Sequence, residues 1–214
     1  MKENKLSIKK TARYFSLGNL NENTTHIWIV CHGYRQLAKY FIRNFNQLDP
    51  QHFIIAPEGL HRFYIDGYSG KVGASWMTSE NRLEDINDYV NYLDQLMSQT
   101  KSQINHNPKI IVLGFSQGGA TAARWVCQGI SHVDSLILWS AVFPPDLNFE
   151  LDANQLKDLH FEIVIGNEDE FINEETLTSN IKRLKQEKIP FHLTRFNGTH
   201  KIYQDVLIKI ANKL

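Results

Sequence analysis

The chain has 214 residues, which suits one domain with a full-sized hydrophobic core, and we expect a single domain over residues 1–214. Its 23 lysines and arginines balance its 23 aspartates and glutamates. A nucleic acid is therefore not expected as the main partner, because phosphate binding requires a basic excess. The two cysteines are too few for a disulfide framework, and the polar N-terminus lacks the apolar stretch of a secretory signal, so we expect a cytoplasmic protein.

Short apolar runs along the chain predict β-strands, several of them buried on both faces. After one or two extended segments within residues 6–17, the predicted strands are Ile27–Cys31, His52–Ala56, Ile110–Leu113, Ser135–Trp139, Phe161–Ile165 and Phe191–Phe196. Each run is far too short to span a bilayer, so no membrane span is expected.

Amphipathic stretches between these runs predict helices. Residues 81–97 repeat apolar side chains at helical spacing, and Asn81 with Glu84 resembles a capping box. A second helix is expected to begin near Asn173, with Glu174 and Glu175 in its first turn. A last helix is expected to carry Tyr203, Val206, Leu207 and Ile210. Strands that alternate with helices predict an α/β fold, in which a mostly parallel central sheet carries helices on both faces.

Two connections, residues 57–80 and 140–159, are longer than a compact domain requires. Both leave the carboxyl ends of predicted strands, where ligands bind in open α/β sheets. Phe63, Tyr64, Tyr68 and Trp76 lie in the first connection and are our candidates for substrate-binding residues. The alternative is that both connections are plain surface loops. Neither is large enough for a separate lid domain.

The most specific motif is Gly114-Phe115-Ser116-Gln117-Gly118. It matches G-x-S-x-G, the strand-to-helix turn that exposes the nucleophilic serine of α/β-hydrolases. A predicted strand precedes it and a helix rich in small residues follows it, as the turn requires. Side chains two positions either side of the serine would clash with the packed strand or helix. Ser116 is therefore the candidate nucleophile; the alternative is a structural turn with an inert serine.

A serine nucleophile needs a base and a carboxylate that orients the base, which follow it in the order acid, then histidine, in this fold. His200 lies in a loop between the last strand and the last helix, where a base is expected, although it could instead cap that helix. For the acid, the sequence between Gly166 and Glu170 contains three carboxylates, and the pattern alone does not choose between Glu168 and Asp169.

Backbone N–H groups that stabilise the developing oxyanion are expected from the residue after the nucleophile and from an earlier loop. Gln117 is the first donor. The second is Tyr34, because His32-Gly33 directly follows a buried strand and Gly33 lets the backbone turn sharply. His32 is expected to be structural.

Together these residues resemble the phospholipase/carboxylesterase family, which includes the acyl-protein thioesterases. Gly114–Ala120 is similar to its nucleophile signature, His32-Gly33 to its oxyanion loop and His200 to its terminal histidine. Gly166-x-x-Asp169 is similar to its acid motif, and this resemblance favours Asp169 over Glu168. The chain departs from the family where Arg35-Gln36 replaces an acidic residue and where Met77-Thr78 follows the tryptophan, which leaves the substrate open.

The motifs predict a serine carboxylic-ester or thioester hydrolase that forms an acyl-enzyme on small to medium acyl substrates. No cofactor is expected, and no cluster of histidine, cysteine and aspartate has the spacing of a metal site. Two alternatives remain: a non-catalytic ligand-binding protein on the hydrolase fold, and a serine peptidase whose terminus anchor is Glu58, Arg62 or Arg82. The sequence neither requires nor excludes a homo-oligomer.

Overall fold

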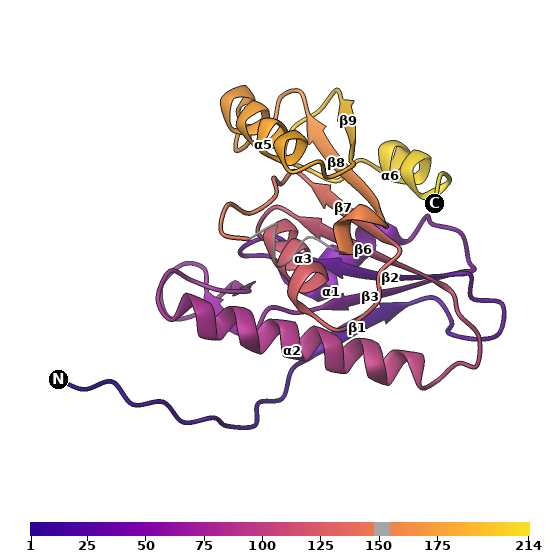
Figure 1. Ribbon diagram of the computed structural model, residues 1–214. Coiled ribbons are helices and arrows are strands. Elements are labelled where there is room, and N and C mark those ends of the chain that lie inside the picture. The colour runs from indigo at the N-terminus through magenta and orange to yellow at the C-terminus, as the bar shows by residue number, and fades with distance from the viewer. Residues whose placement is uncertain (148–154) are drawn as a thin grey trace.

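The computed structural model describes residues 1–147 and 155–214. Its main sheet has seven strands in the order β1-β3-β2-β6-β7-β8-β9 (Figure 1). The strands are β1 (Tyr14–Leu17), β2 (His26–Cys31), β3 (His52–Pro57), β6 (Lys109–Phe115), β7 (Ser135–Trp139), β8 (His160–Gly166) and β9 (His192–Phe196). The six predicted strands from Ile27 onward are thus confirmed, with small shifts at their ends such as the exclusion of Phe191 from β9. Of the extended segments expected within residues 6–17, only Tyr14–Leu17 forms a strand.

All neighbours in this sheet are parallel except β1, which pairs antiparallel with β3. The chain adds β3 on one side of β2 and then returns to place β6 on the other side. In open α/β sheets, ligands bind at the carboxyl ends of the strands where the order reverses in this way. Here those ends carry the His32-Gly33 loop and Ser116.

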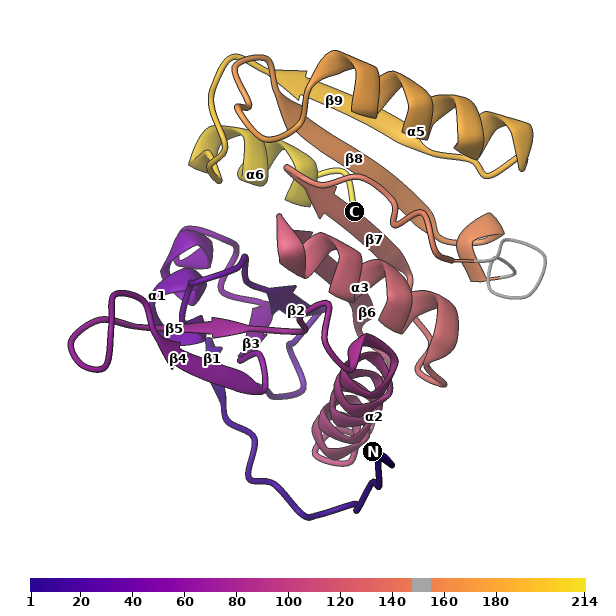
Figure 2. The same cartoon turned by 90° about the vertical axis from the view of Figure 1, so that its left-hand side faces the viewer.

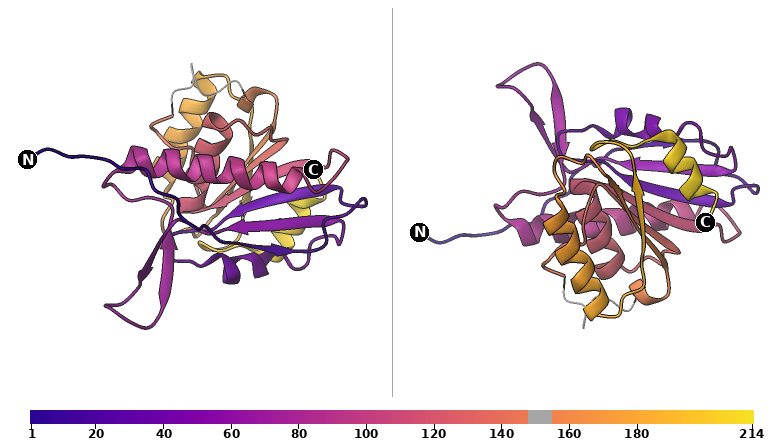
Figure 3. Two further views of the ribbon diagram at one scale, coloured as in Figure 1. Left: turned by 90° about the horizontal axis from the view of Figure 1, so that it is seen from below. Right: turned by 90° about the horizontal axis from the view of Figure 1, so that it is seen from above.

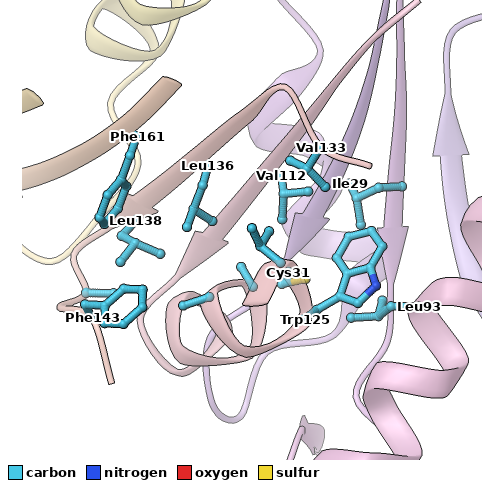
Figure 4. Packing of buried hydrophobic residues seen from close by; sticks show 14 of the residues in the cluster. Ile29, Cys31, Leu93, Val112, Trp125, Val133, Leu136, Leu138, Phe143 and Phe161 are labelled. Carbon is cyan, nitrogen blue, oxygen red and sulfur yellow. The ribbon is translucent and has the colours of Figure 1, made fainter. Parts of the chain in front are cut away.

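Two buried hydrophobic layers attach helices to the two faces of the sheet, as the sequence predicts. One layer packs α2 (Arg82–Lys101), α3 (Gln117–Gln128) and α5 (Glu174–Gln186) against one face. The other packs the short helices α1 (Ala38–Phe41) and η1 (Ile42–Phe45), together with α6 (Gln204–Ala211), against the opposite face (Figure 2). Figure 4 shows Trp125 of α3 and Leu93 of α2 close to sheet side chains such as Ile29 and Val112.

The segment 57–80, which the sequence predicts as a loop, contains a β-hairpin. Strands β4 (His61–Tyr64) and β5 (Val72–Ser75) pair antiparallel in a separate sheet. The hairpin projects away from the body of the molecule (Figure 3). Its strands are short and lack a continuous apolar run, so periodicity did not distinguish them from a loop.

The two predicted helix starts have different outcomes. Helix α5 begins near Asn173 as predicted, and the Asn173 side chain caps it by accepting a hydrogen bond from the Thr176 N–H at 2.8 Å. The capping box at Asn81 is wrong: this residue has left-handed backbone angles and its side chain caps nothing. Asp85 instead accepts a hydrogen bond from the Thr78 N–H at 3.2 Å.

Of the second long connection, residues 148–154 lie outside the described residues, and η2 (Gln155–Lys157) follows them. Across the part of the chain that the structure describes, no helix combines the length and the apolar character needed to cross a membrane.

Candidate active site

Ser116 sits on a strained turn between β6 and α3. Its backbone has φ 54° and ψ −120°, a conformation that non-glycine residues rarely adopt. A Cβ on Gly114 would lie 2.2 Å from the Gly118 carbonyl oxygen, and a Cβ on Gly118 would lie 2.2 Å from the carbonyl oxygen of Cys31. The structure thus supports the steric reason for both glycines, since the turn can pack against its neighbours only without side chains there.

The acid and base candidates meet at the carboxyl end of the sheet. His200 Nδ1 lies 2.9 Å from both carboxylate oxygens of Asp169. The Asp169 side chain is fully buried, whereas that of His200 is 11% exposed. A carboxylate that receives the Nδ1–H holds the imidazole in one tautomer and orientation, which leaves Nε2 as the basic nitrogen.

Backbone pairing between two loops brings these residues together. The Asn167 N–H donates to the Phe196 carbonyl and the Glu168 N–H donates to the Gly198 carbonyl, at 2.8 and 2.9 Å. A Cβ on Gly166 would lie 2.3 Å from the Gly198 carbonyl oxygen, so a side chain there would separate the loops. Glu168, the other acid that the sequence allowed, is exposed, and the structure pairs Asp169 with His200 instead.

Several neighbours keep the Asp169 carboxylate ionised. Burial alone would raise its pKa, but its neighbours, among them the Phe171 N–H and His200, which donate hydrogen bonds to it, bring the net pKa below the usual value of an aspartate. The buried Ser140 hydroxyl beside it lowers the pKa further, although the two groups are not aligned as a regular hydrogen bond. Ser140 follows β7 and was missed by sequence reasoning, because nothing in its local pattern sets it apart.

His200 lies next to the nucleophile turn but does not yet bond to it. Its ring packs between Phe115, at 4.9 Å between ring centroids, and Phe171, at 4.6 Å. Among the hydrogen bonds of the described residues, none joins Ser116 to His200, although the sequence led us to expect the two within hydrogen-bond distance. Catalytic hydrogen bonds are often long or poorly aligned without substrate. The packing of His200 against Phe115, the residue before Ser116, is therefore the observation that places it beside the serine.

The loop that contains Tyr34 is held rigidly from below by His32, which is fully buried. His32 Nε2 accepts a hydrogen bond from the Gly59 N–H at 3.0 Å, so Nδ1 carries the proton and lies 2.7 Å from the Gly33 carbonyl oxygen. Burial lowers the pKa of His32, which keeps the ring neutral. The expected structural role of His32 is confirmed.

Two backbone donors remain unused beside the nucleophile. In the described part of the chain, neither the Tyr34 N–H nor the Gln117 N–H donates to a protein acceptor. Gln117 is the first residue of α3, whose N-terminal N–H groups also favour a negative charge. These are the two groups that the sequence assigns to an oxyanion hole.

The β4–β5 hairpin holds the loop that contains Tyr34 from the side opposite His32. The Arg35 N–H donates to Ala74 and the Ala74 N–H donates to Gln36, at 3.0 and 3.1 Å. The Gln117 side chain crosses to the same segment, where its amide contacts the Trp76 N–H and the Met77 carbonyl. The hairpin, which sequence reasoning missed, is therefore part of the scaffold of the site.

The four predicted substrate-binding aromatics have different positions. Trp76 is fully buried and its indole N–H donates to the His32 carbonyl at 2.9 Å, so it supports the loop rather than lining a surface. Phe63 stacks on Tyr34 with ring centroids 5.4 Å apart. Tyr64 is 49% exposed on the hairpin, and Tyr68 at its tip is 97% exposed with no ring contact among the described residues.

The residues considered as anchors for a peptide terminus are engaged within the protein. Glu58 is buried and pairs with Arg13 at 2.5 Å and with Arg62 at 3.5 Å. Arg82 pairs with Asp146 at 2.6 Å. No group of three or more histidine, cysteine or acidic side chains within residues 1–147 and 155–214 could hold a metal ion.

Comparisons with known proteins agree with this architecture. The most similar structures include maize (Zea mays) acyl-protein thioesterase 2, with a TM-score of 0.72 and 16% identity over 95% of this chain and 97% of that one. A Bacillus cereus carboxylesterase gives 0.69 and 12% over 94% and 92%. A phospholipase/carboxylesterase from Dyadobacter fermentans gives 0.68 and 14% over 94% and 95%.

No curated protein sequence is detectably similar to the chain. Residues 24–166 match the family described as serine aminopeptidase, S33. This span contains the His32-Gly33 loop, the strained serine turn and the strand that ends at the acid loop. The fold, the strand order and this match agree, and the chain belongs to the serine aminopeptidase S33 family of α/β-hydrolases.

Proposed function

We propose that the protein is a serine carboxylic-ester or thioester hydrolase with Ser116 as nucleophile, His200 as base and Asp169 as the orienting acid. The observation that carries this proposal is the buried Asp169–His200 pair beside a strained serine turn. The unused N–H groups of Tyr34 and Gln117 support it, because they provide donors where the oxyanion would form.

In this mechanism, Ser116 Oγ bonds to the substrate carbonyl carbon while its proton passes to His200 Nε2. The oxyanion accepts hydrogen bonds from the N–H groups of Tyr34 and Gln117. When the intermediate collapses, the bond to the alcohol or thiol breaks and His200 returns the proton to that leaving group. Water then attacks the acyl-enzyme by the same route and releases the acid and free Ser116.

Asp169 stabilises the imidazolium that forms in each step. Its pKa below 3.8 means that it stays ionised at neutral pH, so it can balance the charge on His200 without taking the proton itself. We further propose small to medium acyl substrates, because no large inserted segment covers the serine turn in the described residues. Two free cysteines agree with a cytoplasmic location.

A peptidase is the second candidate, since the family description refers to aminopeptidases. An aminopeptidase needs a free acidic group for the ammonium of its substrate. Glu58, which we considered for this task, is instead buried against Arg13 and Arg62. Glu58 is thus engaged elsewhere, and the solved structures of the same fold include an acyl-protein thioesterase and a carboxylesterase, so we favour ester over amide hydrolysis.

The test compares hydrolysis of 4-nitrophenyl butyrate and of alanine 4-nitroanilide by the native protein and by Ser116→Ala. We expect ester turnover that falls by roughly 10⁵-fold or more in the variant. Faster turnover of the anilide than of the ester would favour the peptidase. No turnover of either probe by the native protein would contradict the hydrolase proposal and favour a non-catalytic binding role.

A further inference from the structure

A cavity of about 690 Å³ lies between α1 and the loop end of the β4–β5 hairpin. Its lining includes the three cations Arg35, Lys39 and Lys71 and no carboxylate. The other four cavities described each include at least one aspartate or glutamate. Because the whole chain has no net charge, the local excess of cations at this cavity favours the binding of a negative group there.

Two of these cations have no acidic partner. Among the described residues, no carboxylate lies within ion-pair distance of Lys39 or Lys71, whereas Arg35 lies 3.8 Å from Asp66. The Lys39 ammonium lies over the ring of Tyr40, 4.7 Å from its centroid. An anion in the cavity would therefore find free donors rather than displace existing ion pairs.

The cavity also has an apolar part, formed by Leu37, Phe41, Ile65 and Val72. Leu37 and Phe41 belong to the buried core and are fixed by packing. Cations at the rim and apolar side chains inside suit a ligand with a short carbon chain and an anionic end.

Two observations place the cavity beside the proposed active site. Arg35 directly follows Tyr34, the proposed oxyanion donor. Phe41, on the wall of the cavity, lies 6.0 Å from Phe115 between ring centroids, and Phe115 in turn packs against His200. The cavity wall and His200 thus contact the same ring, which places the cavity beside the substrate that we propose for Ser116.

Two exposed acidic side chains close to His200 lie on the other side of the nucleophile. Glu168 and Glu170 follow β8, while Arg35 and Lys39 follow β2, and these strands are on opposite sides of β6 in the sheet (Figure 2). A substrate with one anionic end is therefore drawn into a single orientation, with that end toward α1.

We propose that this cavity binds an anionic group of the substrate, so that the enzyme prefers esters that carry a carboxylate or a similar anion on a short chain. This inference rests on the proposed function, because it names the substrate class of the same site. Exposed cations bind anions weakly and are screened by salt, so the preference should be moderate and should fall with ionic strength.

The experiment uses two matched pairs of esters. Mono(4-nitrophenyl) glutarate and 4-nitrophenyl pentanoate have acyl groups of equal length, one ending in a carboxylate and the other in a methyl group. The butyrates of 4-hydroxybenzoate and of phenol place the same difference on the leaving group. For each pair the readout is the ratio of kcat/KM for the anionic ester to that for the neutral ester.

We expect the native ratio for at least one pair to fall by about threefold in Lys39→Gln or in Lys71→Gln, and by about tenfold in the double variant. Addition of about 0.5 M salt should lower the native ratio in the same direction. Lys182→Gln is the control, because this exposed lysine on α5 removes the same charge far from the cavity. An unchanged ratio for both pairs in the double variant would overturn the proposal.

A binding experiment tests the cavity independently of the proposed hydrolase activity. Glutarate is titrated into Ser116→Ala, with and without the two lysine substitutions, and amide NMR shifts of Leu37 and Gly70 report on the cavity. Shifts that saturate and are lost with the lysines support the cavity even if no ester is hydrolysed. Absence of such shifts, or equal shifts in both variants, contradicts the cavity even if esters are hydrolysed.

Discussion

Phe115 packs against His200 with the ring planes inclined at 51°. Because Phe115 directly precedes Ser116, the backbone that positions the nucleophile also carries the ring that positions the base. Phe115 is 5% exposed and contacts Phe41 on its other side. One core aromatic therefore connects the serine turn, the base and the helix beside the oxyanion loop.

Replacing Phe115 with leucine should affect catalysis more than folding. The smaller side chain leaves the imidazole less constrained, and we expect kcat for an ester to fall by about tenfold with a smaller change in KM. Phe161→Leu removes a ring that is equally buried, in the other layer of the core, and is the control. If the two variants lose the same kcat at equal residual stability, the contact has no catalytic role.

Asp169→Asn should lower kcat by roughly 10³–10⁴-fold, because the amide neither balances the imidazolium nor enforces the same tautomer. The pKa of Asp169 lies below 3.8, so the native carboxylate is ionised throughout the neutral range, and the loss should be the same from about pH 5 to 8. Glu168→Gln changes the exposed acid next to it and should retain most activity. A larger loss in Glu168→Gln would reassign the acid.

Gly118→Ala should destabilise the fold and abolish activity together. The added Cβ would lie 2.2 Å from the Cys31 carbonyl oxygen and 2.6 Å from that of His32. These are backbone atoms that cannot rotate away, so we expect a loss of about 3 kcal/mol in the free energy of unfolding, measured by urea denaturation. Gly67→Asn, at an open position of the hairpin tip with φ +77°, should cost well under half of that. An equal loss of unfolding free energy in both variants would mean that the backbone conformation of glycine, and not the close contact at Gly118, causes the destabilisation.

Arg124, Asp146 and Arg82 form an ion-pair cluster that ties the segment after β7 to α3 and α2. Arg124 is buried and contacts Asp146 at 2.8 and 3.1 Å, and Arg82 contacts it at 2.6 Å. Asp146→Asn leaves the buried guanidinium without its counter-charge. We expect it to cost about 2 kcal/mol of unfolding free energy near neutral pH, less than for a fully buried pair because Asp146 is partly exposed.

The pH dependence of this cost has a defined sign. Partial burial opposes ionisation, but hydrogen bonds from Arg124 and Arg82 lower the pKa of Asp146 from 3.8 to about 2. A lowered pKa stabilises the fold fully above the unfolded value, and this stabilisation disappears as the pH falls from about 4 to about 2. The stability difference between the native protein and Asp146→Asn should therefore shrink over that range. A difference that stays constant down to about pH 2 would show that the carboxylate charge is not its source.

The sequence was most informative where a residue type has one physical use. Gly114 and Gly118 were predicted from the close packing that the serine turn requires, and the structure contains that packing. The buried strands were recognised because a parallel sheet covered on both faces leaves continuous apolar runs. The start of α5 near Asn173 was recognised because Glu174 and Glu175 follow it, and the helix macrodipole favours carboxylates in the first turn.

Features that depend on contacts across the fold were not visible in the sequence. The β4–β5 hairpin has no apolar run, and its role follows from backbone bonds to the loop around Arg35. Trp76 lies in an aromatic segment that suggested a pocket wall, yet its indole is used to hold the His32 carbonyl. The choice of Asp169 over Glu168 needed either the family resemblance or the geometry of the structure, because nothing in the local sequence distinguishes three consecutive carboxylates.

Asp169 follows β8 and His200 follows β9, which are the last two strands of the sheet, and β9 is an edge strand. Sheet edges open more readily than central strands, often as a cooperative unit that leaves the rest folded. Detachment of β9 with α6 would remove His200 from the site while β2 and β6 still hold Ser116 and its donors. Heat or denaturant should therefore inactivate the enzyme before Trp76 and Trp125, which are buried in the other layer of the core, register any unfolding.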